Sequence, residues 1–538
     1  MLLVQPNLSY RAVSENQQER KAVNEAFARS VLYSFNILNE KEGKYLVDIS
    51  DMLFADAHHV AETLRDKKQG TYSLDKDRSA VELSRTKAFP ENVEFDVMLT
   101  FSGKPEGRYV NSVTPDGHNI TINQHHSFVK LPDDNYKPRS FHAQSACIPI
   151  SYFDFSTPVY EPIRKQNIIR HRLEKKNPEL AVSEPVEPII YYLDRGTPEP
   201  VRSALLEGGS WWDEAFSEIG FENAFRIEML PEGADPMDIR YNVVQWVHRS
   251  TRGWSYGDAV VDPRTGEIIK GHVSLGSLRV RQDFMIAQAL MKKPFATDNS
   301  NHQAMMDLAL ARIRQLSAHE IGHTLGFTHN FAASTNQRSS VMDYPHPLIR
   351  LKKGEIVMDD AYAEGIGEWD KVTVAYAYSD FRNNEKEELE KILSDARKHE
   401  LRFISDKDAR APGGAHPHAH LWDNGANSID ELKNILEVRS NAINNFSADN
   451  IREGEALSML EDVFVPLYFF HRYQLEAVSK LVGGLEYSYS VKGDSTEAPA
   501  AVDAEIQRDA LGILIKTLSP DVLMIPEDKL ELFPPRAY

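Results

Sequence analysis

The chain has almost no cysteine and no long apolar run. Cys147 is the only cysteine among 538 residues, so no disulfide can form within the chain. No stretch of eighteen apolar residues occurs, and we therefore expect no membrane span. A chain without disulfides fits a reducing cytosol and also many exported bacterial proteins, so cysteine usage leaves the compartment open.

Basic charge is also scarce. Lys and Arg total 61 against 80 Asp and Glu, which gives a net charge of −19 at pH 7. This balance argues against a general nucleic-acid or anionic-membrane surface. The acidity says nothing about the substrate. Hydrophobic residues at 41% and charged residues at 26% are ordinary for a globular protein, and this length suffices for two to four domains.

One short segment carries a nearly complete set of metal ligands. His319 and His323 are four residues apart, so on a helix both imidazoles project from one face. Two imidazoles at that spacing can bind one zinc ion. Glu320 follows the first of them, which places its carboxylate beside the metal and leaves it free to take a proton from the attacking water.

A turn and a third histidine complete this motif. Gly326 is expected to end the helix, because glycine adopts the positive φ that turns the chain back. His329 can then reach the metal from outside the helix as the third ligand. The fourth position stays open for water, which is typical of a catalytic rather than a structural zinc site. The alternative is an amphipathic helix with solvated or core histidines, but chance rarely adds the glycine and third histidine.

A second motif follows about a dozen residues later. Met342 lies in the segment Ser339–Pro345, and a methionine in a tight turn beneath three zinc-bound histidines is the Met-turn of the metzincin metalloproteases. Residues 319–329 and Met342 therefore resemble the metzincin clan. Tyr344 resembles the tyrosine that astacin-like and serralysin-like members place beside the zinc. Asn330 departs from the best-known subfamilies, which have Glu, Pro, Asp or Ser after the third histidine.

Other segments are similar to a large group of bacterial zinc-dependent metalloproteases, in which a metzincin domain follows a domain of unknown function. These segments are Tyr191–Asp194, Trp211–Phe216 and Gly365–Asp370. The resemblance implies one catalytic Zn²⁺ and a periplasmic or secreted protein. Met1–Asn7 lacks the basic and apolar parts of a signal peptide and is typical of a strand. We therefore expect the chain to be an internal fragment or the product of a truncated gene model.

The expected fold is α+β, with three regions. Residues 1–185 alternate apolar and polar residues, which predicts a β-rich domain. A proline-rich segment, 178–188, is expected to act as a linker. Strands are expected at 93–99 and 119–122, turns at Ser102-Gly103 and Asp116-Gly117, and helices near 16–34 and 58–66.

Residues 186–385 are expected to form the metzincin catalytic domain, a mixed sheet with an active-site helix and the Met-turn. Gly271–Leu275 would be its edge strand, where an extended peptide can add as one more strand; an ordinary hairpin strand is the alternative. Further strands are expected at 189–193, 225–229 and 241–247, and helices at 198–219 and 302–324.

Residues 386–538 are expected to be mainly helical, with helices at 385–398, 428–445 and 451–480. His416, His418 and His420 have a spacing that could bind a metal. No carboxylate or cysteine pattern accompanies them, so a loop is the preferred interpretation.

Cys147 allows two interpretations. Its thiolate could occupy the fourth zinc position and keep the enzyme latent, as in the cysteine-switch propeptides of matrix metalloproteases. The surrounding residues do not match that motif, and free cysteine is often simply part of a core, so we favour a buried, inert side chain.

Together these features predict a zinc metalloendopeptidase that acts on a peptide or protein substrate. Glu320 would be the general base, and Tyr344 would help to stabilise the oxyanion. Met342 would form a hydrophobic base under the metal without binding it. Two alternatives stay open: another zinc hydrolase or exopeptidase on the same scaffold, and a non-catalytic binding module that retains zinc. The intact general base argues against the second.

Overall fold

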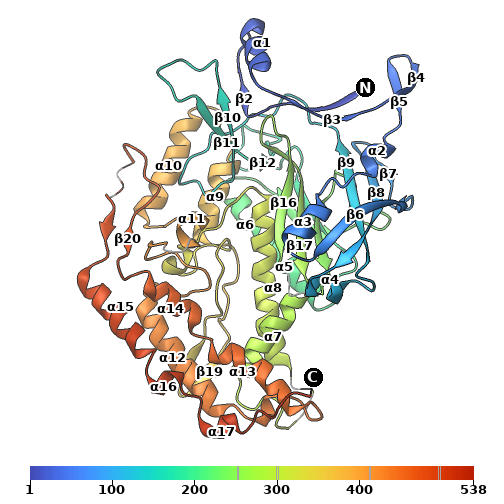
Figure 1. The fold of residues 1–538 in the computed structure, drawn as a ribbon. Coiled ribbons are helices and arrows are strands. Elements are labelled where there is room, and N and C mark those ends of the chain that lie inside the picture. Colours follow the sequence, from blue (N-terminus) through green and yellow to red (C-terminus); the bar gives the residue numbers. More distant parts are fainter. Residues whose placement is uncertain are drawn as a thin grey trace.

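The computed structural model describes residues 1–250, 254–297, 300, 302–410, 414–494, 496 and 498–537. They form a mixed α/β fold in which strands dominate the N-terminal part and helices the C-terminal part (Figure 1). The expected fold class is confirmed. No helix in the described ranges is both long and apolar enough to span a membrane.

A four-stranded antiparallel sheet forms the core of the N-terminal part. Its strands are β6 (Gly70–Val81), β7 (Lys87–Ala88), β8 (Asn92–Pro105) and β9 (Asn119–Val129). Alternate residues of β8 point to one face, and Val97, Leu99 and Phe101 are fully buried there. The turn expected at Ser102-Gly103 is wrong. Both residues pair with β6, and Ser102 also pairs with β9. Strand β8 therefore continues through these residues without a turn.

The expected helix at 16–34 is only half right. Helix α1 (Gln17–Ala26) ends early, and β3 (Ser30–Ser34) pairs antiparallel with β1 (Leu2–Gln5). Val31 is β-branched and Tyr33 is aromatic, and both residue types favour strands. This preference explains why the expected helix does not extend to residue 34. The helix near 58–66 is confirmed as α3 (Val60–Asp66). Smaller elements are β2 (Tyr10–Arg11), β4 (Ile37–Lys41), β5 (Lys44–Val47), α2 (Ser50–Leu53), α4 (Arg108–Val113), β10 (Pro149–Asp154) and β11 (Arg164–Ile168).

A six-stranded sheet lies beside the central helix. Its order is β12 (Arg170–His171), β17 (Glu267–Gly276), β15 (Asn242–Val247), β13 (Ile189–Leu193) and β14 (Phe225–Met229), all paired in parallel, with β16 (Tyr256–Val261) added antiparallel to β17. The strands expected at 189–193 and 225–229 are confirmed with those bounds. Within the proline-rich segment 178–188, Ser183 forms an isolated β-bridge with Phe221. The domain boundaries expected after residues 185 and 385 stay predictions.

The prediction that Gly271–Leu275 is the edge strand is wrong. These residues belong to β17, which pairs with β15 on one side and with β16 on the other. The turn after β16, closed by the Gly266 N–H donating to the Asp262 carbonyl at 2.9 Å, folds the two strands into a hairpin. As a result β16, not β17, is the outer strand on this side.

Helix α8 (Gln303–Thr324) runs through the centre of the molecule, as expected for residues 302–324 (Figure 1). Its sequence is rich in Ala, Leu, Met, Gln and Arg, which are good helix formers, and apolar residues cover several of its faces. Helices α5 (Val201–Ser210) and α7 (Leu278–Leu290) pack against it. The single helix expected at 198–219 is broken at Trp211 into α5 and α6 (Trp212–Glu218).

The C-terminal part contains α9 (Glu368–Tyr378), and α10 (Glu385–Lys398) and α12 (Ser428–Asn445) confirm two expected helices. The helix expected at 451–480 is wrong as one element. Gly454 has φ +89°, and the α-helices within this range are α13 (Leu460–Tyr468) and α14 (Arg472–Ser479), which both follow it. Further elements are β18 (Arg350–Lys352), β19 (Glu355–Val357), α11 (Asp406–Ala409), β20 (Leu485–Glu486), β21 (Ala500–Ala501), α15 (Ala504–Lys516), α16 (Pro520–Leu523) and α17 (Glu527–Leu530).

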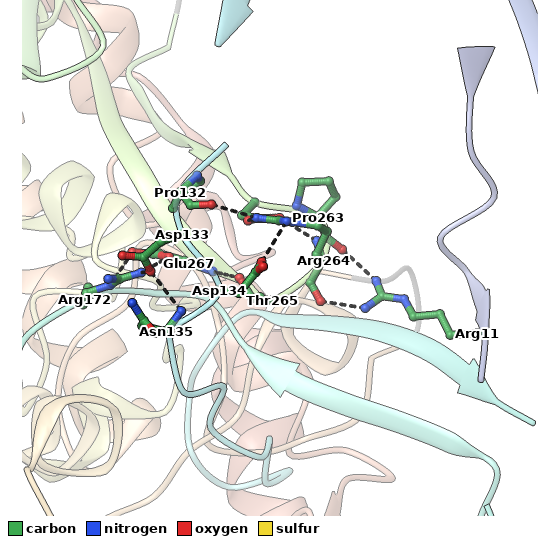
Figure 2. Close-up of polar contacts among 11 residues, drawn as sticks. Arg11, Pro132, Asp133, Asp134, Asn135, Arg172, Pro263, Arg264, Thr265 and Glu267 are labelled. Carbon is green, nitrogen blue, oxygen red and sulfur yellow. Dashed lines mark hydrogen bonds and ion pairs between the residues drawn. The ribbon is translucent and has the colours of Figure 1, made fainter. Parts of the chain in front are cut away.

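Arg11, in the N-terminal part, hydrogen-bonds the turn between β16 and β17. Arg11 donates to the carbonyls of Arg264 at 2.6 Å and Pro263 at 2.7 Å (Figure 2). Close by, Arg172 bridges Asp133 and Glu267. The contacts of Arg11 tie the turn after the outer strand β16 to a residue more than two hundred positions away in the sequence.

Candidate metal centre

Three histidine side chains converge at the C-terminal end of α8. His319 and His323 come from the helix itself, and His329 comes from the segment that follows it. One ring nitrogen from each lies within 4.8 Å of the others. No other group of three or more metal-ligating side chains occurs in the described part of the chain.

Each imidazole is oriented by a hydrogen bond from its Nδ1. His319 donates to the Val341 carbonyl at 2.7 Å and His323 to the Phe327 carbonyl at 2.8 Å. His329 donates to the Asp406 carboxylate at 2.8 Å. With Nδ1 protonated, each Nε2 carries a free lone pair, which is the form that binds a metal.

These Nε2 atoms lack satisfactory partners within the protein. The His319 Nε2 is buried and has no hydrogen-bond partner among the described residues. The Nε2 atoms of His323 and His329 lie 3.1 Å apart. Two lone pairs at that distance repel each other unless they share a proton or a cation. The site therefore fits a zinc ion, whose preferred ligands include neutral imidazole nitrogens.

Burial favours the neutral form of the two imidazoles that the helix carries. Burial, reinforced by the other two histidines, lowers the pKa of His319 well below its usual value. Burial also lowers the pKa of His323 to about 4, with His329 adding to the effect. A neutral ring is the form required of a ligand, so no proton has to be displaced at neutral pH.

Gly326 ends the active-site helix. Its φ is +99°, and its N–H donates to the His323 carbonyl at 3.0 Å. A Cβ at this position would lie 2.2 Å from the Ile169 carbonyl oxygen. Glycine is required here by both conformation and space, and the turn brings His329 back toward the helix.

Met342 lies directly under the helix. A Cβ added to Gly322, which stands between the two helical histidines, would come within 2.3 Å of the Met342 Sδ. The preceding carbonyl, that of Val341, accepts the bond from His319. The Asn330 N–H donates to the Met342 carbonyl at 3.0 Å, which links the segment of the third histidine to the Met-turn.

Asp370 at the start of α9 holds this turn. Its carboxylate accepts from the Ser340 hydroxyl at 2.6 Å, the Val341 N–H at 2.8 Å and the Gly367 N–H at 2.9 Å. Burial raises the pKa of Asp370 to about 7, against the effect of these bonds. Because Val341 orients His319, Asp370 is connected to the metal centre through one residue.

Tyr344 faces the histidines. Its ring centroid lies 4.7 Å from that of His329 and 5.1 Å from that of His319. On the other side, the Trp422 ring is 5.0 Å away, and the Arg410 guanidinium carbon is 5.0 Å from the Tyr344 centroid. The Tyr344 ring therefore lies between the histidines on one side and an aromatic ring and a guanidinium group on the other.

Glu320 is buried next to the first histidine. Its side chain is 5% exposed, and the backbone N–H of Gly257 on β16 hydrogen-bonds its carboxylate. Burial raises the pKa of Glu320 to about 8, with Arg312 and the Gly257 bond acting in the opposite direction. A cation held by the histidines would also oppose the rise, because positive charge favours the carboxylate.

Asp406 is the site residue that sequence reasoning missed. It lies 77 positions from His329, in the short helix α11, and no local motif marks it. Burial alone would raise the pKa of Asp406, but its bonds to His329 and Arg410 lower it well below the usual range. The carboxylate therefore stays charged beside the third histidine.

We expect Asp406→Ala to weaken zinc binding by about 10–100-fold, the usual effect of removing a carboxylate that orients a metal-bound imidazole. Competition with a chromophoric chelator would measure the affinity. The matched control is Asp395→Ala, which removes a carboxylate bonded to Lys398 on α10. Equal zinc affinity in the two variants would show that Asp406 has no such role.

The other candidate ligands are not members of this group. The Cys147 thiol is 2% exposed and donates to the Ser145 carbonyl at 3.4 Å, and burial raises its pKa to about 12. These features favour the inert interpretation. His416 contacts the Tyr487 carbonyl, and His418 and His420 lie near separate glutamates.

Comparison with known families supports the motif. Residues 301–535 match the family described as Met-zincin, and residues 1–176 match a domain of unknown function (DUF5117). No curated protein and no solved structure matches the chain. The expected resemblance, a metzincin domain preceded by a domain of unknown function, is confirmed. A Met-zincin domain implies one catalytic zinc ion, and the histidine group has the ligands that it needs.

Proposed function

We propose that this chain, whose residues 301–535 match the Met-zincin family, is a zinc metalloprotease that cleaves internal peptide bonds with Glu320 as its general base. The observation that carries the proposal is the position of a buried carboxylate beside three converging imidazole nitrogens. A structural zinc site has no use for a carboxylate that is not a ligand.

His319, His323 and His329 would hold the zinc through their Nε2 atoms. When bound, zinc supplies Lewis-acid chemistry, which polarises the scissile carbonyl and acidifies the attacking water. The Glu320 carboxylate accepts the proton of that water and then donates it to the leaving amide nitrogen. The Tyr344 hydroxyl donates a hydrogen bond to the carbonyl oxygen as negative charge develops on it.

The substrate would bind along β16. This strand pairs with β17 alone among the described strands, so its other edge is able to accept a further strand. Gly257 in β16 also contacts Glu320, which brings this edge close to the general base. A peptide added in this way is held through its main chain and needs no free terminus, which supports internal cleavage.

Digestion of a peptide library blocked at both termini tests the proposal. We expect internal cleavage by the zinc-loaded protein, its loss with a chelator and its recovery when zinc is restored. Cleavage of only those peptides that have a free terminus would favour an exopeptidase. Zinc binding without any cleavage would favour a non-catalytic binding module.

Tyr344→Phe separates a role in chemistry from simple packing, because it removes the hydroxyl and keeps the ring. We expect turnover to fall by about 10–10³-fold with zinc content unchanged, the scale of one lost oxyanion donor. Tyr473→Phe is the matched control, since its ring contacts Trp422 but its hydroxyl accepts from Arg472. Turnover within about twofold of wild type across several peptides would assign Tyr344 to packing.

A further inference from the structure

Arg312 on α8 is a buried cation without an acceptor. Its side chain is 2% exposed, and its Nε and Nη1 have no hydrogen-bond partner in the described ranges. Burial lowers the pKa of Arg312, which shows how poorly the surroundings compensate its charge. Buried guanidinium groups are normally paired with an anion, and leaving the donors unsatisfied is costly.

The position of Arg312 links it to the metal centre. It precedes His319 by seven residues, so both side chains project from the same face of α8, about 10 Å apart along the axis. Glu320 is among the charged groups that act on Arg312. The cation therefore lies on the face of the helix that carries the zinc ligands and is not part of a remote core.

A tryptophan ring connects this cation to Tyr344. The guanidinium carbons of Arg312 and Arg279 lie 5.9 and 5.5 Å from the centroid of the Trp422 ring. The backbone N–H of Trp422 donates to the Tyr344 carbonyl at 2.8 Å. Trp422 has φ +66°, which is uncommon for a bulky residue and is often maintained at binding sites.

The Asp283 carboxylate, whose charge acts on Arg312, is already bonded to another arginine. Asp283 is fully buried on α7, and its two oxygens accept from Arg279 Nε at 2.9 Å and Nη2 at 3.0 Å. Tyr362 adds another unsatisfied donor, because its buried hydroxyl has no partner and its ring centroid is 5.8 Å from the Arg312 guanidinium carbon. Arg312 and Tyr362 therefore both keep buried polar atoms that have no hydrogen-bond partner among the described residues.

We propose that Arg312, with Arg279 and Trp422, forms a subsite that binds a carboxylate of the peptide substrate. The proposal rests on the proposed peptidase function and assigns it a substrate class: peptides with an acidic side chain, or with their C-terminal carboxylate, near the scissile bond. The planar guanidinium fork matches the two carboxylate oxygens. Arg279 and Trp422 are only partly buried, so the carboxylate would approach Arg312 from their side.

The helix geometry limits where this carboxylate lies in the peptide. An extended peptide advances about 3.3 Å per residue, so the axial separation of about 10 Å corresponds to about three residues. A long side chain such as glutamate shortens that interval. We therefore expect the preferred acid within about three residues of the scissile bond.

Binding to the zinc-loaded Glu320→Gln protein tests the subsite without requiring catalysis. Fluorescent peptides would carry Glu or Gln at each position in turn, and each would be made with a free or an amidated C-terminus. We expect one carboxylate to tighten binding by about 10-fold or more. A preference for Glu over Gln identifies a side chain, and a preference for the free acid over the amide identifies the C-terminus. Equal affinities throughout the set would overturn the proposal.

Arg312→Met tests whether this residue is responsible. We expect it to abolish the carboxylate preference and to leave affinity for the neutral peptide within about threefold. Arg314→Met is the matched control on the same helix, where the arginine pairs with Glu207, and it should keep the preference. If Arg312→Met does not fold, Arg312→Lys, which keeps the charge and loses the fork, should reduce the preference.

A carboxylate preference that persists in the Arg312 variant would overturn the assignment. Failure of the proposed function would look different. Carboxylate peptides would then still bind preferentially, but wild-type protein would cleave none of them.

Discussion

Replacing Glu320 with glutamine is expected to lower peptide turnover by about 10²–10⁴-fold while zinc stays at one ion per chain. The amide has the shape of the carboxylate but cannot accept a proton from the attacking water. Its side chain is not one of the three converging histidines, so metal binding should be preserved. The loss should therefore appear in kcat, with folding and zinc content unchanged.

Parallel kinetics and elemental analysis would measure both quantities. Glu207→Gln is a suitable control, because it makes the same chemical change in a half-exposed glutamate that pairs with Arg314. Near-normal turnover in the Glu320 variant would exclude this residue as the general base and leave the site without one.

The second large effect is expected for His329→Ala. This variant removes one of three nitrogen ligands and also leaves the Asp406 carboxylate without its histidine partner. Zinc affinity should fall by more than the 10–100-fold expected for Asp406→Ala, because a ligand contributes more than the group that orients it. Activity should decline in parallel with zinc content.

Elemental analysis after dialysis against a weak chelator would measure this loss. His399→Ala is the control, since that histidine is exposed and bonds only to the Asp395 carbonyl of its own helix. Full zinc occupancy in the His329 variant would remove the three-histidine interpretation, because this residue distinguishes it from a two-histidine site.

The parts of the site that could be predicted from sequence are those whose residues are close together in the chain. The interval between His319 and His323 becomes a shared helix face by geometry alone, and Gly326 marks the end of that helix. Strands β13 and β14 were also predictable, because β13 is a short apolar run and β14 alternates apolar with charged residues.

The rest depends on contacts between distant segments. Asp406 and Asp370 act on the histidines from separate helices, and their local sequences do not show which distant groups they contact. Similarly, Arg312 looks like an ordinary helix former until its burial is known. The edge strand was misassigned for the same reason: strand order in a sheet is a tertiary property, and a run of apolar residues does not show which neighbour covers it.

Titration of zinc into chelator-stripped protein, with hydrolysis of a doubly blocked peptide followed at each step, tests the central claim most directly. We predict no hydrolysis without metal, a linear rise in activity with added zinc, and a plateau at one zinc per chain. Hydrolysis by the stripped protein, or one tightly bound zinc per chain with no hydrolysis of any peptide in a diverse library, would contradict it.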